Sequence, residues 1–189
     1  DGCYTGFVRK LIVQYVKDLT AGRLAAGFEH CYQVYHLARE IGKGQDYDDD
    51  VLHAACFLHS IEIPARRLEE AIEKAEMILA ETGFPPDRIL LVIEAIRHHR
   101  PGSRPGSVEG MLLHDANLLD TMGATGFARL SIGAFFWHHY KTMNDVLELI
   151  RERLSYSDSF HFDRSRALAE PKIRFMKSAV AQMAEELAQ

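Results

Sequence analysis

Residues 48–61 read Asp-Asp-Asp-Val-Leu-His-Ala-Ala-Cys-Phe-Leu-His-Ser-Ile, and this stretch decides the class of fold. Its apolar residues recur at the three- and four-residue steps that mark one face of an α-helix, namely Val51, Ala54, Ala55 and Leu58. The acidic triplet at residues 48–50 can cap the first turn and complement the helix dipole. Because Pro64 follows closely, the pattern predicts a helix that ends near Ile61.

The same helical period runs along most of the chain, and strand patterns are hard to find. Further helices are predicted over residues 8–19, 28–38, 66–82, 85–99, 108–122, 124–138, 141–154 and 171–187. Residues 100–107 repeat the tetrapeptide Arg-Pro-Gly-Ser and predict a loop, whereas residues 155–164 look irregular. No linker divides the chain, so we expect one all-α domain over residues 1–189, a bundle of about eight helices.

Composition places the chain among ordinary globular proteins. Of its 189 residues 47% are hydrophobic and 26% charged, which excludes a disordered or fibrous chain. The 22 basic and 27 acidic side chains give a net charge of −5, so we expect no nucleic acid polymer as a partner. The longest apolar run, residues 89–93, is far below the roughly 18 residues of a membrane span. With no export signal visible, we expect a cytoplasmic protein without a membrane partner.

Ten histidines are the compositional oddity. Four positions on different predicted helices stand out, namely His30, His59–Ser60, His98–His99 and His114–Asp115. Imidazole and carboxylate suit Zn²⁺, Mn²⁺, Fe²⁺ or Co²⁺, and inward-facing residues of neighbouring helices build such sites in bundles. Spacing alone leaves two interpretations open, a metal site or histidines buried for structural reasons.

Three segments carry a resemblance to a known family. They are His-Cys-Tyr-Gln-Val-Tyr-His-Leu-Ala-Arg-Glu-Ile at residues 30–41, Ala-Ala-Cys-Phe-Leu-His at residues 54–59, and Asp-Ala-Asn-Leu-Leu-Asp-Thr-Met-Gly-Ala-Thr-Gly-Phe-Ala-Arg at residues 115–129. In order and separation they resemble the HD-domain superfamily of metal-dependent phosphohydrolases, most closely its small stand-alone bacterial members. The resemblance covers residues 24–135, which would form the core, and leaves residues 141–189 as C-terminal helices.

The resemblance implies an all-helical core that binds divalent metal and hydrolyses phosphate esters. Carried over by position, His30, His59 and Asp115 match the metal ligands of the family. Activities in the family include nucleotide pyrophosphatases, phosphomonoesterases and cyclic-nucleotide phosphodiesterases. The implied partner is therefore a small phosphorylated substrate, and the implied cofactor is one divalent ion, Mn²⁺, Fe²⁺, Co²⁺, Zn²⁺ or Ni²⁺.

The sequence departs from the family at the His-Asp pair that names it, because Ser60 stands where the aspartate is expected. A serine hydroxyl is neutral and a poor ligand at neutral pH, so we expect one metal ion rather than two, with Ser60 facing it. Glu62 could supply the missing carboxylate if the helix unwinds after Ser60. The alternative for Glu62 is an ordinary surface position.

Further candidates come from the same resemblance. The resemblance implies that His98 and His99 lie near the substrate, and one of them could serve as a general acid or as a donor to phosphate. Adjacent helical residues point about 100° apart, so at most one of the two faces the pocket. Arg129 could neutralise a phosphate or form an ion pair on the helix surface. Arg100 and Arg104 could close over a polyphosphate or simply be solvated.

Two functions stay open. The first is a metal-dependent phosphohydrolase that acts on a nucleotide or other small phosphate ester. The second is a degenerate HD domain that has lost turnover and binds a ligand or a partner.

Asp120 is expected to orient its neighbours rather than bind metal. The last predicted helix carries an apolar stripe that packs either on the domain or on a second copy, in a homodimer, through Ile173, Met176, Val180, Met183 and Leu187.

Overall fold

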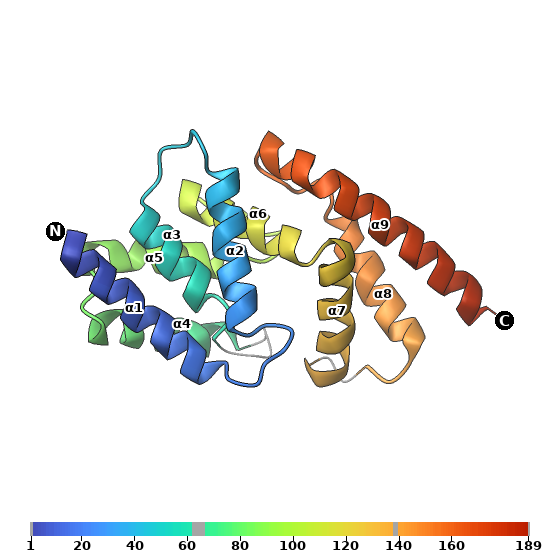
Figure 1. The fold of residues 1–189 in the computed structure, drawn as a ribbon, viewed down its shortest axis with the longest axis horizontal. Helices are drawn as coiled ribbons and strands as arrows, with labels where there is room; N and C mark the ends of the chain where they lie inside the picture. The colour runs from blue at the N-terminus through green and yellow to red at the C-terminus, as the bar shows by residue number, and fades with distance from the viewer. Residues whose placement is uncertain (1, 62–66, 138–139, 189) are drawn as a thin grey trace.

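The computed structural model describes residues 2–61, 67–137 and 140–188, and within these ranges the chain is an all-α bundle without strands (Figure 1). Its nine described helices are α1 (Gly2–Leu19), α2 (Phe28–Ile41), α3 (Asp49–Leu58), α4 (Leu68–Glu81), α5 (Pro86–Arg97), α6 (Val108–Asp120), α7 (Gly123–Trp137), α8 (Met143–Ser155) and α9 (Asp163–Leu187). The predicted fold class is thereby confirmed. No helix in the described ranges is long and apolar enough to cross a membrane.

The helices form two groups (Figure 1). Helices α1 to α6 make up the larger group, and α7 to α9 form the second group, which carries the C-terminus. Helix α6 lies between them, because it packs on α2, α3 and α5 and also on α7 and α9. A site beside α6 can therefore take side chains from both groups.

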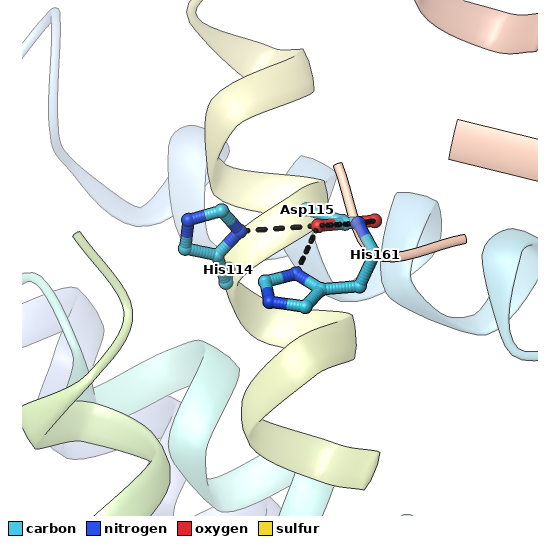
Figure 2. A group of neighbouring side chains, drawn as sticks. All are labelled: His114, Asp115 and His161. Atoms are coloured by element: carbon cyan, nitrogen blue, oxygen red, sulfur yellow. Dashed lines mark hydrogen bonds and ion pairs between the residues drawn. The ribbon is translucent and has the colours of Figure 1, made fainter. Parts of the chain in front are cut away.

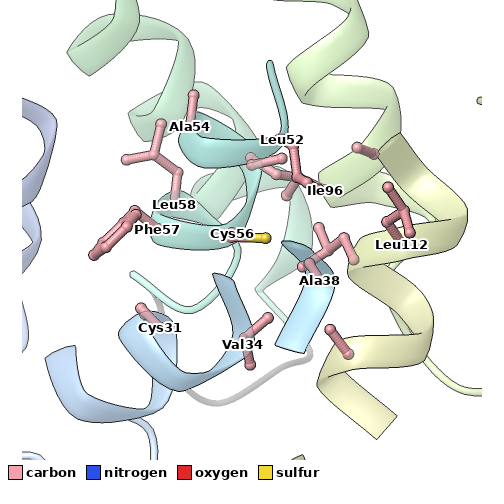
Figure 3. Packing of buried hydrophobic residues seen from close by; sticks show 14 of the residues in the cluster. Cys31, Val34, Ala38, Leu52, Ala54, Cys56, Phe57, Leu58, Ile96 and Leu112 are labelled. Atoms are coloured by element: carbon pink, nitrogen blue, oxygen red, sulfur yellow. The ribbon is translucent and has the colours of Figure 1, made fainter. Parts of the chain in front are cut away.

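Helix α3 is the centre of the larger group, and every residue from Val51 to Leu58 is buried. It contacts α1, α2, α5 and α6, and Figure 3 shows its side chains packed beside those of its neighbours. The neighbouring side chains labelled there include Ala38 of α2, Ile96 of α5 and Leu112 of α6, all fully buried. Because α3 is surrounded in this way, its last turn is held rigidly inside the bundle.

The acidic residues in front of α3 have two roles. Asp48 is the N-cap, and its carboxylate accepts hydrogen bonds from two backbone N–H groups of the first turn. Arg9 of α1 pairs with Asp49 at 2.9 Å and with Asp50 at 2.7 Å, and Arg88 of α5 pairs with Asp48 at 2.9 Å. The triplet was predicted as a cap, and it also ties α1 and α5 to the start of α3.

The last helix begins earlier than predicted. Helix α9 starts at Asp163, so Pro171 lies inside the helix and not at its start. The reason is tertiary, because the carboxylate of Asp115 on α6 accepts the backbone N–H groups of His161 and Phe162 at 2.9 and 3.1 Å. These bonds hold the chain in position to begin α9. An interior proline removes one helical hydrogen bond, and packing on α7 and α8 offsets that cost.

The apolar stripe of α9 packs within its own chain. Met176 belongs to the hydrophobic core, and Ile173, Val180 and Met183 pack against it. Leu187 at the end of the helix is 38% exposed. Of the two arrangements expected for this stripe, the structure shows the one in which it covers the domain.

A sharp corner joins α6 to α7, since α6 ends at Asp120 and α7 begins at Gly123. Gly123 has φ +78°, in the left-handed region that favours glycine. Gly126 passes so close to the corner that a Cβ atom there would lie 2.2 Å from the carbonyl carbon of Thr121. The corner therefore decides how the end of α6 meets the first turns of α7.

Replacing Gly126 by alanine should destabilise the protein by about 1 to 3 kcal/mol, because the added methyl group must displace backbone atoms. Chemical denaturation monitored by circular dichroism measures this change. The matched control is Gly6→Ala in α1, where a Cβ atom meets nothing within 4 Å. We expect that control to be neutral or slightly stabilising. Equal stability of the two variants would contradict the tight corner.

Candidate metal-binding cavity

A cavity of about 360 Å³ lies between the two groups of helices. Its wall is built from the chain before α2, the end of α3, the start of α4, the loop after α5, and parts of α6, α7 and α8. The wall combines apolar side chains with histidines and arginines. The histidines are His30, His59 and His99, and the arginines are Arg67, Arg100, Arg129 and Arg153. The predicted His30 and His59 thus lie in one cavity.

His30 and His59 face each other, with their Nε2 atoms 3.1 Å apart. The other nitrogen of each ring, Nδ1, is hydrogen-bonded to an oxygen. Nδ1 of His30 bonds to the Asp120 carboxylate at 2.6 Å, and Nδ1 of His59 bonds to the carbonyl of Cys56 at 2.8 Å. Because these oxygens accept, each Nδ1 carries a hydrogen, and when both rings are neutral each Nε2 presents a lone pair. Two facing lone pairs are stable when a cation lies between them, and metal-binding histidines are held by their outer nitrogen in this way.

The charge state of the rings suits metal binding. Burial lowers the pKa of His59 well below its ordinary value, and the neighbouring His30 and His99 lower it further. Burial also lowers the pKa of His99 to about 4. The ring centroid of His99 is 5.2 Å from that of His59. At neutral pH His59 and His99 are therefore uncharged, which is the form that binds a metal ion.

Helix α6 turns Asn117 and Asp120 toward the histidine pair. Asn117 lines the cavity, and the carboxylate of Asp120 bonds to His30 and also lies 3.2 Å from Nε of Arg129. Residues three apart on a helix lie within about 60° of one another, so Asn117 and Asp120 share a face. Asp120 thus orients His30, and the α6 side chain that lines the cavity beside the pair is a neutral amide.

Asp115, the third predicted ligand, does not join the two histidines. It precedes Asn117 by two residues and therefore points about 200° away around α6. Its carboxylate bonds to His114 Nδ1 at 3.0 Å and to His161 Nδ1 at 2.9 Å (Figure 2). The prediction placed Asp115 by its position in the chain, and the rotation of α6 turns it to the opposite side.

The cluster of His114, Asp115 and His161 has the composition of a metal site, with ligand atoms that all lie within 4.8 Å of one another. Its carboxylate, however, already accepts both imidazole N–H groups and the backbone N–H groups of His161 and Phe162. Burial would raise the pKa of the Asp115 carboxyl, yet hydrogen bonds from His114, Ser165 and His161 outweigh burial and lower it. The cluster therefore fastens the start of α9 to α6.

Ser60 lines the cavity, as the resemblance implied, but its hydroxyl donates to the carbonyl of Ala26 at 3.2 Å. Nη1 of Arg23 bonds to the carbonyls of Ser60 and Ile61 at 3.4 and 3.0 Å and so fixes the end of α3. The hydroxyl is thus available to a ligand only as a neutral oxygen. Glu62, the other candidate at this end of α3, lies outside the described residues.

His99 faces the cavity and His98 does not. His99 is 8% exposed and lines the cavity wall. His98 is directed back along α5, with Nδ1 3.4 Å from the carboxylate of Glu94. Of the two adjacent histidines, only His99 is therefore placed for a role in the site.

Two of the predicted arginines reach the cavity. Arg129 lies in its wall, where Nη1 donates to the carbonyl of Ala25 at 3.1 Å and Nε pairs with Asp120. Its charge is therefore already partly balanced inside the protein. Arg100 also lines the cavity, whereas Arg104 is not among the described lining residues.

Sequence reasoning missed several lining residues, among them Asn117 and Arg153. Asn117 lies three residues before Asp120, the spacing that places two side chains on one helix face. That spacing could have identified it. Arg153 belongs to α8, beyond the segments that carry the family resemblance, and no local pattern distinguishes it from Arg151.

The fold is an all-α bundle whose cavity holds a pair of facing histidines, and comparison with known proteins gives its family. The HD domain model matches residues 27–122, and the chain belongs to the HD domain family. Among curated proteins it is similar to the uncharacterised protein YpgQ of Bacillus subtilis, with 24% identity over 191 residues that cover 95% of this chain and 92% of YpgQ.

Solved structures support the same fold over almost the whole chain. A protein of Lactobacillus plantarum aligns with a TM-score of 0.80 and 22% identity, covering 96% of this chain and 97% of that one. Bacillus subtilis YpgQ in complex with ADP aligns with a TM-score of 0.68 and 24% identity, covering 94% and 97%. An HD-superfamily hydrolase of Bacillus thuringiensis aligns with a TM-score of 0.71 and 21% identity, covering 98% of both chains.

The geometry separates the roles of two aspartates on α6. Asp120→Asn should weaken the binding of Mn²⁺ or Zn²⁺ by about 10- to 100-fold, because His30 loses the charged partner that orients it. Asp115→Asn should leave metal affinity within about twofold and lower the melting temperature, since a buried network loses a charged acceptor. Isothermal titration calorimetry and thermal unfolding measure the two effects. If Asp115→Asn weakened metal binding as much as Asp120→Asn, Asp115 would be a ligand after all.

Proposed function

We propose that this HD domain is a metal-dependent phosphohydrolase with a single metal ion, acting on a nucleotide or other small phosphate ester. The observation that carries the proposal is the pair of facing Nε2 atoms of His30 and His59 within an arginine-lined cavity. The ADP complex of the similar YpgQ supports a ligand of nucleotide size. The cavity of about 360 Å³ falls in the range of small-molecule sites.

His30 and His59 would hold the ion, with Asn117 and Ser60 as neutral oxygen donors in the same cavity wall. A bound divalent ion lowers the pKa of a coordinated water and polarises a phosphoryl oxygen. The two imidazoles are uncharged ligands, so they leave the full charge of the ion to attract the phosphate. Fewer anionic ligands also mean weaker retention of the metal.

The remaining polar residues suit the handling of a proton and of phosphate charge. Nδ1 of His99 bonds to the carbonyl of Ile96, so its Nε2 is free to accept a hydrogen. Burial lowers the pKa of His99 to about 4, so the neutral ring presents Nε2 as a hydrogen-bond acceptor, and we assign His99 to the handling of a proton in this site. Arg100 and Arg129 also line the cavity, and we assign them to balancing the charge of the phosphate.

A second candidate function is ligand binding without turnover. It is favoured by the neutral character of Ser60 and Asn117, which line the cavity together with the histidine pair. The carboxylate of Asp120 is engaged by His30 and Arg129. In this alternative the cavity binds the phosphorylated molecule and the protein responds to it without hydrolysis.

Turnover separates the two functions. The wild type should release phosphate from a panel of nucleoside mono-, di- and triphosphates when Mn²⁺, Co²⁺ or Fe²⁺ is added, and EDTA should abolish the activity. His59→Gln should lower it by about 100-fold or more, because a metal ligand is lost. The matched control is His36→Gln, an exposed histidine of α2 that bonds to Tyr32. Absence of turnover together with retained nucleotide binding would favour the second function.

Restoring carboxylates tests the metal position directly. Ser60→Asp and Asn117→Asp should each tighten Mn²⁺ binding about tenfold, because each adds an anionic ligand beside a positive ion. The control Ser178→Asp adds the same charge on an exposed part of α9. Identical metal affinity in Ser60→Asp and in the control would mean that position 60 does not face the ion.

A further inference from the structure

Arg153 differs from Arg67 and Arg129 of the same cavity wall in forming no ion pair within the described ranges. It lies on α8, beyond residues 27–122 that match the family model, and it lines the cavity. Its Nε atom is buried and makes no hydrogen bond, and across the described ranges no carboxylate lies within ion-pair distance of it. By contrast, Arg151 on the same helix pairs with Glu148 at 2.6 Å, and Arg129 pairs with Asp120.

A partly buried cation without an ion-pair partner is costly, so the position of Arg153 in the cavity wall needs an explanation. Burial lowers the pKa of the Arg153 guanidinium, but an arginine stays charged in proteins. Desolvating such a charge without an anion destabilises the folded chain. A ligand anion in the cavity would supply the missing partner, and the planar donor set of a guanidinium matches phosphate oxygens well.

The surroundings of Arg153 are suited to a phosphorylated organic molecule. Leu149 and Tyr156, four residues before and three after it, line the cavity on the same face of α8. A Cβ atom on Gly102 would lie 3.4 Å from the Tyr156 ring, so this ring packs beside the loop that carries Arg100. Glu152 is the one acidic residue among the described lining residues, and it is exposed. The wall thus offers apolar, aromatic and cationic surface together.

We infer that Arg153 forms a second anion subsite in the cavity and that the ligand therefore carries at least two phosphate groups. One phosphate lies at the histidine pair and another at Arg153, so the preferred class is a nucleoside diphosphate or triphosphate over a monophosphate. The placement of the first phosphate rests on the proposed function. The second subsite belongs to α8 and requires no metal ion.

Binding measured without metal tests this inference. Isothermal titration calorimetry in EDTA should show that the wild type binds ADP at least about tenfold more tightly than AMP. Arg153→Met keeps the length of the side chain and removes its charge, and it should weaken ADP binding by about tenfold or more while affecting AMP less. Arg151→Met, at an exposed position of the same helix, should bind both nucleotides as the wild type does.

A thermal readout distinguishes this role from a merely structural one. Without ligand, Arg153→Met should melt no lower than the wild type, because a partly buried charge without an ion-pair partner is removed. Arg153→Lys keeps the charge but loses the planar donor set, and it should show an intermediate preference for ADP. This second variant keeps the test valid if the methionine variant does not fold.

Several results would overturn the inference. Equal ADP affinity in the wild type and the Arg153 variants would do so, and so would equal affinity of the wild type for ADP and AMP. Failure of the proposed function is a separate outcome. If the wild type prefers ADP in EDTA and loses this preference in Arg153→Met, the subsite stands even when no metal supports turnover. If metal-dependent turnover is seen with an unchanged KM for ADP in Arg153→Met, the hydrolase stands and the subsite falls.

Discussion

The cavity depends on the buried hydrogen bond between His30 and Asp120, in which Nδ1 of the ring lies 2.6 Å from the carboxylate. This bond joins α2 to the last turn of α6 and sets the direction in which the imidazole presents its other nitrogen. Arg129 of α7 pairs with the same carboxylate and also donates to the carbonyl of Ala25 before α2. One buried carboxylate thus aligns three segments of the chain. Its own charge is compensated by the groups that it positions, so its burial is tolerable.

The distribution of charge around the cavity follows from that arrangement. Asp120 is engaged behind the histidine pair, and the side chains beside the pair, Ser60 and Asn117, are neutral. The positive charge of the wall is therefore concentrated on the arginines, which come mainly from outside the α2–α3–α6 core. In a metal site rich in carboxylates the protein neutralises the ion, whereas under the proposed function the phosphate of the ligand would supply most of that negative charge. Metal binding and phosphate binding should accordingly reinforce one another.

Much of the fold could be predicted from the sequence because its signals are local. Each of these signals acts over a few residues. They are the capping aspartate in front of α3, the apolar period of α2, α4 and α5, and the glycine that begins α7. The start of α9 could not be predicted, because Pro171 resembles a first helical residue and the bonds from Asp115 to the preceding backbone come from a distant helix. The local pattern predicted that the last helix begins at Pro171, whereas the tertiary contact sets its start at Asp163.

By itself the sequence determined an all-α chain of the HD type with His30 and His59 at the ends of segments whose spacing is typical of that family. Only the tertiary structure decided which face of α6 completes the site. Helix α6 is buried on nearly all sides, so Leu112, Asp115, Leu119 and Asp120 are all inaccessible to solvent and no apolar stripe marks its orientation. Because Asp115 and Asn117 are two residues apart, their side chains point about 200° apart around the axis of α6. Packing against α2, α3 and α9 sets that rotation, because each of those neighbours must bury its own apolar side chains against α6.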